Sequence, residues 1–363
     1  MIAKMGRLDW QPLLARLRLP SPPLQVLDQL YRQPILITGA GGTIGSALAL
    51  RLGNIGPSSL LLLDTAESRL YDLQQSWQTE GVPGAMTPIL GSTADRALLD
   101  EIFTTRAPSI VFHTAAFKHV ALMEEQPLAA IANNVYGTLT LSRAASAVGA
   151  RTILLSSDKA VEPASVMGAT RWLSERIVLA AGGIVLRTGN VLGSRDSVTE
   201  TFALQIAAGQ PLTITDPAAR RYFLTLDEAV NLLMMTLAEP PGSLLAPELR
   251  EPTYITDLAH FMAQSLAPDR SVPIDFTAPR PGEKDPLHFW AAAESPRPAA
   301  LPGLLSLQYH PIDVPSLESG LADLRATLEM RDASAAMTQL CELVPDYTPS
   351  PAVRAASNLR VSS

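Results

Sequence analysis

Cysteine is almost absent from this chain of 363 residues, and Cys341 is the only one. A single thiol cannot form an internal disulfide or a cysteine-rich metal site, which favours a reducing compartment. The five histidines and the cysteine also lack the spacing of metal ligands. The sequence therefore predicts neither a disulfide framework nor a metal centre.

Long apolar runs are missing as well. The longest ones, such as residues 60–63 and 231–238, are far too short to cross a bilayer. The first 20 residues contain scattered Lys and Arg without a continuous apolar segment, so we expect no signal peptide. Basic residues are also the minority, with a net charge of −7, which argues against a nucleic-acid partner. We therefore expect a cytoplasmic protein without a transmembrane segment.

Hydrophobic residues make up 47% of the chain and charged residues only 17%, so a large core can form. From Pro34 onward, short apolar segments alternate with amphipathic ones. This alternation predicts a parallel sheet with helices on both faces, which is a Rossmann-type doubly wound α/β fold. The expected strands are 34–39, 59–64, 86–90, 109–115 and 151–157, and the expected helices between them are 43–53, 67–77, 95–103 and 128–149.

The glycines of TGAGGTIG lie between the first strand and the first helix. Gly39 permits a tight turn, Gly42 allows the main chain to approach a pyrophosphate, and Gly45 lets the helix pack close to the strand. Asp64 ends the next strand, where a carboxylate accepts the adenosine ribose hydroxyls and repels a 2′-phosphate. This pattern predicts an NAD site, with NADP less favoured, although Arg69 weakens that preference.

The segment SSDKAVEPASVMGATR, residues 156–171, follows the fifth strand. A nicotinamide-dependent short-chain dehydrogenase would have Tyr-x-x-x-Lys here, but this chain has Met167 and Arg171. Met167 cannot transfer a proton. Asp158 and Lys159 are adjacent groups of opposite character just past a strand end, where open parallel sheets bind ligands. From the residues alone, an adjacent Asp–Lys pair is more often a plain surface ion pair.

Several segments, in order, resemble the CapD-like polysaccharide biosynthesis proteins, which include nucleotide-sugar 4,6-dehydratases of the extended short-chain dehydrogenase/reductase superfamily. The resemblance extends from about residue 34 to 347, and it identifies the chain with the short, soluble form of that family. The matching segments are GAGGTIGS, LLDTAESRLYDL, HTAAFKHVALMEEQP, NNVYGT, SSDKAVEPASVMGATR, RTGNVLGSRDSV, RRYFLTLDEAV, PRPGEK and LVPDY.

The resemblance implies conversion of a UDP-hexose, with UDP-N-acetylglucosamine as the expected substrate, to its 4-keto-6-deoxy derivative. The 4-hydroxyl is oxidised, water is eliminated across C5–C6, and hydride returns to C6. The resemblance implies Lys159 as the base at C5, Asp158 as the acid at C6 and Ser157 as a hydroxyl that helps at O4. Met167 would shape this catalytic site.

Two departures from the family pattern concern the cofactor. Ser92 and Thr93 replace an Asp-Val pair that would contact the adenine. Arg171 replaces a Lys that would hold the nicotinamide ribose, and Arg keeps the charge and the donors but cannot lose a proton. We expect Arg171 to contact the ribose; the alternative is that it points to solvent. The other residues that the resemblance implies at the cofactor are Thr43, Ile44, Ala115, Asn134 and Ser156.

The resemblance also implies residues at the sugar nucleotide. Arg221 and Arg280 are expected at the pyrophosphate or uridine, since Arg offers paired donors to a diphosphate. Asn190 is expected at a phosphate or sugar hydroxyl, and Glu283 and Lys118 are further substrate candidates. Composition alone would make PRPGEK an ordinary exposed loop.

The fold implied by the resemblance has a smaller C-terminal substrate-binding lobe, and the family suggests a homo-oligomer. Two other functions stay open: a UDP-sugar 4-epimerase or 4-oxidoreductase, and a catalytically degenerate protein that binds NAD and a UDP-sugar. The expected boundaries are a lead-in segment at 1–33, an NAD-binding domain at 34–190 with a returning segment at about 222–256, a substrate lobe at 191–221 and 257–347, and a mobile tail at 348–363.

Overall fold

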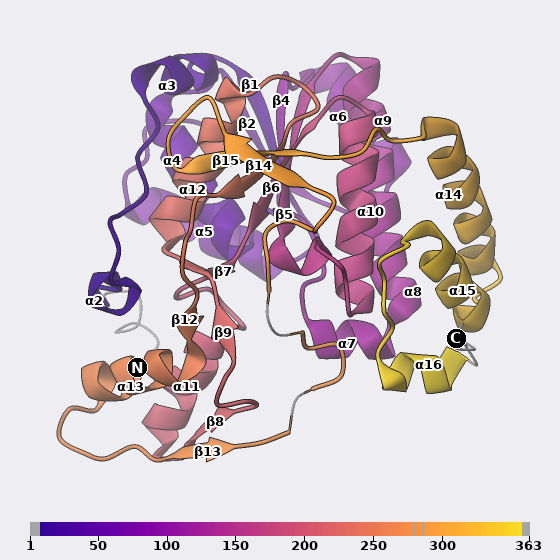
Figure 1. Ribbon diagram of the computed structural model, residues 1–363. Helices are drawn as coiled ribbons and strands as arrows, with labels where there is room; N and C mark the ends of the chain where they lie inside the picture. Colours follow the sequence, from indigo (N-terminus) through magenta and orange to yellow (C-terminus); the bar gives the residue numbers. More distant parts are fainter. Residues whose placement is uncertain (1–7, 279, 285–286, 358–363) are drawn as a thin grey trace.

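The computed structural model describes residues 8–278, 280–284 and 287–357. Within these ranges, nine strands form one large sheet at the centre of the molecule (Figure 1). Across the sheet, the order of the strands is β14 (Ser295–Pro298), β15 (Leu304–Gln308), β11 (Leu244–Pro247), β6 (Ile184–Thr188), β5 (Arg151–Ser157), β4 (Ile110–His113), β1 (Pro34–Thr38), β2 (Ser59–Asp64) and β3 (Met86–Leu90).

The strands from β3 to β11 pair in parallel, and β15 and β14 add an antiparallel edge. The chain builds outward from β1 in one direction through β2 and β3, and then in the other through β4, β5 and β6. This reversal of strand order leaves a crevice between the carboxyl ends of β1 and β4, where doubly wound sheets bind ligands. The expected Rossmann-type fold is confirmed.

Alternate residues of β1 supply the cores on the two faces of the sheet. Ile35 and Ile37 pack in one cluster with α3 (Leu24–Leu30), α4 (Thr43–Ile55), α5 (Glu67–Thr79) and α12 (Leu226–Met235). Leu36 points the other way, toward α6 (Arg96–Arg106) and α9 (Gly137–Ala147). Because both faces are covered, these strands are apolar throughout rather than alternating.

On the α9 side, α10 (Val166–Ala180) packs beside α9 and β5. The long helix expected at 128–149 consists of α8 (Pro127–Ala130), a π-helical segment (Ile131–Tyr136) and α9. A further cluster joins this region to α14 (Val314–Glu329), α15 (Ala333–Leu343) and α16 (Pro351–Ser357), which lie outside α10 in Figure 1.

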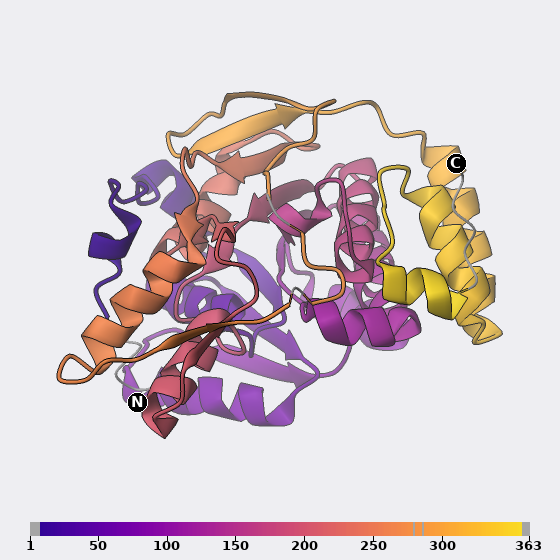
Figure 2. The ribbon, with the colours of Figure 1, turned by 60° about the horizontal axis from the view of Figure 1, so that its bottom comes forward.

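A smaller group of elements lies below the carboxyl ends of the strands in Figure 1 and comes forward in Figure 2. Its core contains side chains of the N-terminal helix α2 (Gln11–Leu14) together with those of α11 (Val198–Ala208) and α13 (Ile255–Leu266). Three short strand pairs accompany them: β7 (Asn190–Val191) with β10 (Phe223–Leu224), β8 (Leu212–Ile214) with β13 (Ile274–Phe276), and β9 (Arg220–Arg221) with β12 (Thr253–Tyr254).

The C-terminal part of the chain differs from the expected layout. Residues 295–308, which the sequence assigns to the substrate lobe, contain the edge strand β14 of the large sheet and its neighbour β15. Pro296 and Pro298 concealed the strand signal of β14. Pro is tolerated at a sheet edge, where a ladder donor is not needed. Residues 351–357 form α16 instead of a free tail, and Val353 is buried in the core. The division into two lobes is otherwise still a prediction.

The ends of some helices also differ from the expected ones. The helix that follows the glycine turn does not end at Gly53 but continues to Ile55, with Gly56 in the left-handed conformation (φ 90°) as its C-cap. The helix α12 is capped by Thr225 in a capping box with Glu228, and Asp227 lies in its first turn. None of the helices in the described ranges is long and apolar enough to cross a membrane.

Gly53 serves packing, because a Cβ at this position would lie 2.3 Å from Trp77 Cη2 and 2.5 Å from Val82 Cγ1. We expect Gly53→Ala to lower the free energy of unfolding by about 1–3 kcal/mol through overpacking, despite the higher helix propensity of Ala. Urea denaturation measures the loss. The control Asn54→Ala, at the exposed neighbouring position, should stay within about 0.5 kcal/mol of the wild type. Equal stability of the two variants would contradict the packing role.

Candidate active site

A cavity of about 750 Å³ occupies the carboxyl ends of the central strands. The glycine turn after β1 forms one side, and the segment after β5 with the first turns of α10 forms another. The fold therefore brings together residues that are far apart in the sequence. The predicted site residues that line the cavity are Gly39, Gly42, Thr43, Ile44, Gly45, Asp64, Arg69, Ala115, Lys118, Ser156, Ser157, Lys159, Met167, Arg171 and Asn190.

The glycine turn has the close contacts that its sequence suggests. Gly39 has φ +69°, and a Cβ there would lie 2.6 Å from the Ala115 nitrogen. A Cβ on Gly45 would lie 2.2 Å from the Gly39 carbonyl oxygen. Gly42 is the N-cap of α4 and contributes no capping side chain. The turn therefore leaves a bare helix N-terminus at the cavity wall, and this arrangement fits the phosphates of a dinucleotide.

Asp64 ends β2 and is held rigidly at the cavity edge. Its Oδ2 accepts the Gly41 N–H at 2.9 Å, and its Oδ1 accepts the Ala66 N–H at 2.9 Å. The nearby Arg69 forms a surface ion pair with Asp72 at 3.9 Å and also lines the cavity. A fixed carboxylate at the end of the second strand fits the ribose of an adenine dinucleotide.

Lys159 lies at the cavity wall and is anchored by two side chains. Its Nζ donates to Asp158 Oδ1 at 2.9 Å and to Asn190 Oδ1 at 3.2 Å. The Ser157 hydroxyl also donates to Asp158 Oδ1, at 2.9 Å. Asp158 itself is fully buried and is not among the residues that line the cavity. The pair is therefore a built feature of the site and not a surface ion pair.

Met167 and Arg171 are one turn apart on α10, and both are buried at the cavity wall. Arg171 does not point to solvent: its Nη2 donates to the Leu155 carbonyl oxygen, whereas its buried Nη1 has no hydrogen-bond partner. Burial lowers the pKa of Arg171 to about 10, against the opposing effect of Glu175. The side chain stays charged at neutral pH and has a donor to spare.

His113, at the end of β4, is structural, as its position suggests. Its Nδ1 pairs with Thr38 Oγ1 at 2.6 Å and its Nε2 with Thr138 Oγ1 at 2.9 Å. Burial, and then the charge of Arg171, lower the pKa of His113 to about 3. The ring is therefore neutral and adds no second positive charge beneath the cavity.

Comparison with known proteins decides the family. The model of a family described as "Polysaccharide biosynthesis protein" matches residues 35–304. The chain belongs to the polysaccharide biosynthesis protein family. The resemblance inferred from the sequence motifs is thereby confirmed.

Family members differ in length and in the activity that their names state. A probable polysaccharide biosynthesis protein EpsC from Bacillus subtilis is 37% identical over 286 residues, which are 76% of this chain but 48% of EpsC. The chain thus spans about half the length of that relative. A UDP-N-acetylglucosamine 4,6-dehydratase (inverting) from Campylobacter jejuni is 30% identical, covering 65% of this chain and 72% of the enzyme. The X-ray structure of Pen from Bacillus thuringiensis has a TM-score of 0.70 at 24% identity, covering 77% and 90% of the two chains.

Four other residues that the family resemblance implied lie outside the cavity wall. Arg221 donates to the Arg220 carbonyl oxygen at 2.7 Å, and Glu283 accepts the Arg280 N–H at 3.2 Å within its own exposed loop. Asn134 is buried and holds the loop after β4, accepting the Phe117 N–H at 2.8 Å. A role for these residues at a ligand stays a prediction.

Sequence reasoning missed Arg195 as a site residue. Its backbone N–H donates to Thr43 Oγ1 at 3.1 Å, and its carbonyl oxygen accepts from Lys118 Nζ at 2.6 Å. The loop that contains it therefore connects the glycine turn with the segment after β4. The segment RTGNVLGSRDSV contains Arg195, but its family resemblance implies only Asn190 as a site residue. Burial lowers the pKa of Lys118 below its ordinary value.

The buried neutral ring of His113 makes stability depend on pH. The pKa of His113 is about 3 in the folded chain and 6.5 ordinarily, so acid favours the unfolded chain. The stability that the neutral ring contributes therefore declines as the pH falls from about 6.5 toward 3. Between pH 8 and pH 5, we expect the wild type to lose about 2 kcal/mol more unfolding free energy than His113→Gln, whose amide does not titrate. Chemical denaturation at both pH values measures this, and an identical pH dependence would show the assignment to be wrong.

Proposed function

We propose that this protein is a nucleotide-sugar 4,6-dehydratase that uses bound NAD and converts a UDP-hexose, with UDP-N-acetylglucosamine as the expected substrate, to its 4-keto-6-deoxy derivative. The observation that carries the proposal is the position of Lys159. Its Nζ lies at the wall of the same cavity as the glycine turn, fixed between Asp158 and Asn190. Met167 occupies the place of the usual tyrosine acid, so the amine is the group available for proton transfer.

The cavity fits a nicotinamide dinucleotide in three respects. The bare N-terminus of α4 suits the pyrophosphate, Asp64 suits the adenosine ribose, and the unpaired Nη1 of Arg171 suits a hydroxyl of the second ribose. When bound, the nicotinamide would accept the hydride from C4 and later return it to C6. Asp64 favours NAD over NADP by charge repulsion of a 2′-phosphate.

Lys159 carries the proton chemistry in this proposal. Once C4 is a ketone, the hydrogen on C5 is acidic, and the Lys159 amine removes it as a general base. The ammonium group so formed can return that proton to the departing 6-hydroxyl, which leaves as water. The elimination of water is then balanced on this one side chain. The proton released from O4 in the oxidation balances the proton that C5 takes up when hydride returns to C6.

Asp158 takes a different role from the one that the family resemblance implied. A fully buried carboxylate that is absent from the cavity wall cannot touch C6 without leaving its site. Its Oδ1 instead holds both the amine of Lys159 and the hydroxyl of Ser157. We therefore assign it the orientation of Lys159, and Ser157 the hydrogen bond to O4.

Incubation of the purified protein with UDP-N-acetylglucosamine and NAD tests the function. We expect mass spectrometry to show a product that has lost one water and has the same nucleotide. A product of unchanged mass with inverted C4 would mean a 4-epimerase. Tight dinucleotide binding without turnover of any UDP-hexose would mean a binding protein.

The role of Lys159 predicts a separation between binding and chemistry. Lys159→Met should bind UDP-sugar normally but lower the rate of deuterium exchange at C5 in D₂O by about 10²-fold or more, because the base is gone. NMR of the recovered sugar measures this exchange. The control Arg96→Met removes a cation whose side chain is 86% exposed on α6 and should exchange like the wild type. Exchange that survives in Lys159→Met would rule out this base.

The position of Asp64 predicts a preference for the dinucleotide. We expect NAD to bind at least about tenfold more tightly than NADP, and Asp64→Asn to narrow that ratio, because the repulsion of a 2′-phosphate is lost. Titration with both dinucleotides measures the ratio. Damage to the turn by the substitution weakens both equally, so the ratio isolates the charge. An unchanged ratio would contradict the role of Asp64.

A further inference from the structure

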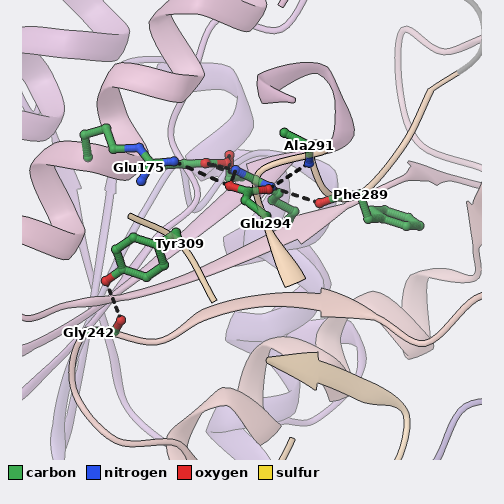
Figure 3. Close-up of polar contacts among 9 residues, drawn as sticks. Glu175, Gly242, Phe289, Ala291, Glu294 and Tyr309 are labelled. Carbon is green, nitrogen blue, oxygen red and sulfur yellow. Dashed lines mark hydrogen bonds and ion pairs between the residues drawn. The ribbon is translucent and has the colours of Figure 1, made fainter. Parts of the chain in front are cut away.

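Beneath the cavity, buried charged side chains alternate in sign from α10 to the loop before β14. Arg171 and Glu175 are one turn apart on α10, Arg187 lies on the adjacent β6, and Glu294 comes from the loop that follows residue 287. Arg176 completes the row at its far end, 3.5 Å from Glu294. Figure 3 shows the contacts of Glu175 and Glu294 and the hydrogen bond that the Ala291 N–H donates to Glu294.

Arg187 lies at the centre of this row, and each nitrogen of its guanidinium donates to at least one acceptor. Its Nε and Nη2 donate to Glu175 at distances of 2.8–3.2 Å, and its Nη1 and Nη2 donate to Glu294 at 2.5 and 2.9 Å. Its side chain is 1% exposed, and that of Glu175 is 0% exposed. Such a pair is maintained only because nearly every donor and acceptor in it is satisfied.

Glu175 has one more partner, and this one belongs to the cavity. The hydroxyl of Ser156 donates to Glu175 Oε1 at 2.6 Å, and Ser156 lines the cavity wall. Glu175 also lies one turn beyond Arg171, and its negative charge raises the pKa of that guanidinium against the effect of burial. The carboxylate therefore acts on two wall residues at once.

We propose that Glu175 is a positioning residue for the dinucleotide end of the cavity. It fixes the Ser156 hydroxyl and balances the charge of Arg171, so that the unpaired Nη1 of Arg171 is offered to a ribose oxygen. This inference rests on the proposed function, because it needs a nicotinamide dinucleotide in the cavity. The replacement of Lys by Arg at residue 171 is then tolerated because a buried carboxylate supports the larger cation.

Glu294 provides a matched control. It pairs with the same Arg187 and is also buried, yet it faces a second cavity of about 370 Å³ and does not line the first. Replacing either glutamate by glutamine removes one negative charge beside the guanidinium of Arg187. A purely structural role would therefore give both variants the same effect on dinucleotide binding.

The experiment measures NAD affinity by calorimetry, and unfolding midpoints, for Glu175→Gln, Glu294→Gln and the wild type. We expect Glu175→Gln to bind NAD about tenfold more weakly and Glu294→Gln to stay within about twofold, with similar losses of stability. In an Arg171→Met background, the effect of Glu175→Gln on affinity should fall to about twofold or less, because it acts through that guanidinium. If Glu175→Gln does not fold, Glu175→Asp keeps the charge but shortens the reach to Ser156, and should weaken binding about threefold.

Equal loss of NAD affinity in Glu175→Gln and Glu294→Gln would overturn the proposal, as would a Glu175→Gln effect that persists in full without the Arg171 guanidinium. If Glu175→Gln does not fold, a Glu175→Asp variant that binds NAD as tightly as the wild type would overturn it. A wild-type protein that binds neither NAD nor NADP would contradict the proposed function itself. That result is distinct from all the others, because they compare variants of a protein that binds.

Discussion

The reversal of strand order between β1 and β4 is the constraint on which the site depends. With strands building outward in both directions, no crossover connection covers the carboxyl ends at that point, and a crevice stays open. The backbone of Gly39 then approaches Ala115 so closely that no side chain fits between them. The turn, the acid on β2 and the segment after β5 all face the same space as a result.

Several charged side chains around that space are almost completely buried. Asp158, Arg171, Glu175 and Arg187 are all nearly inaccessible to solvent, and most of their polar atoms have partners. Removing one member of such a set leaves another charge uncompensated, so these residues cannot vary independently. The atoms without a partner are the ones available to a ligand. Arg171 Nη1 is one of the few buried donors in the described chain without an acceptor.

The structure also changes the meaning of the segment after β5. Its front half places the Lys159 amine at the cavity wall and buries the Asp158 carboxylate behind it. Its back half places Met167 and Arg171 at the wall, as their i, i+4 spacing on one helix predicted. The first distinction could not be read from adjacency, because neighbouring side chains at a strand end can point to opposite sides.

The sequence by itself determined the alternation of strands and helices, the glycine turn, the acid at the end of β2 and the family. All of these are local patterns, since strand period, turn conformation and helix spacing are properties of short segments. Only the tertiary structure decided that Asp158 is buried, that Arg195 joins the wall, and that Arg187 meets Glu294, 107 residues away. Contacts between distant segments are set by how the helices and loops pack on the sheet, and they leave no periodic signal in the chain. The same reason explains the proline-containing edge strand β14, which exists because β15 offers it a partner.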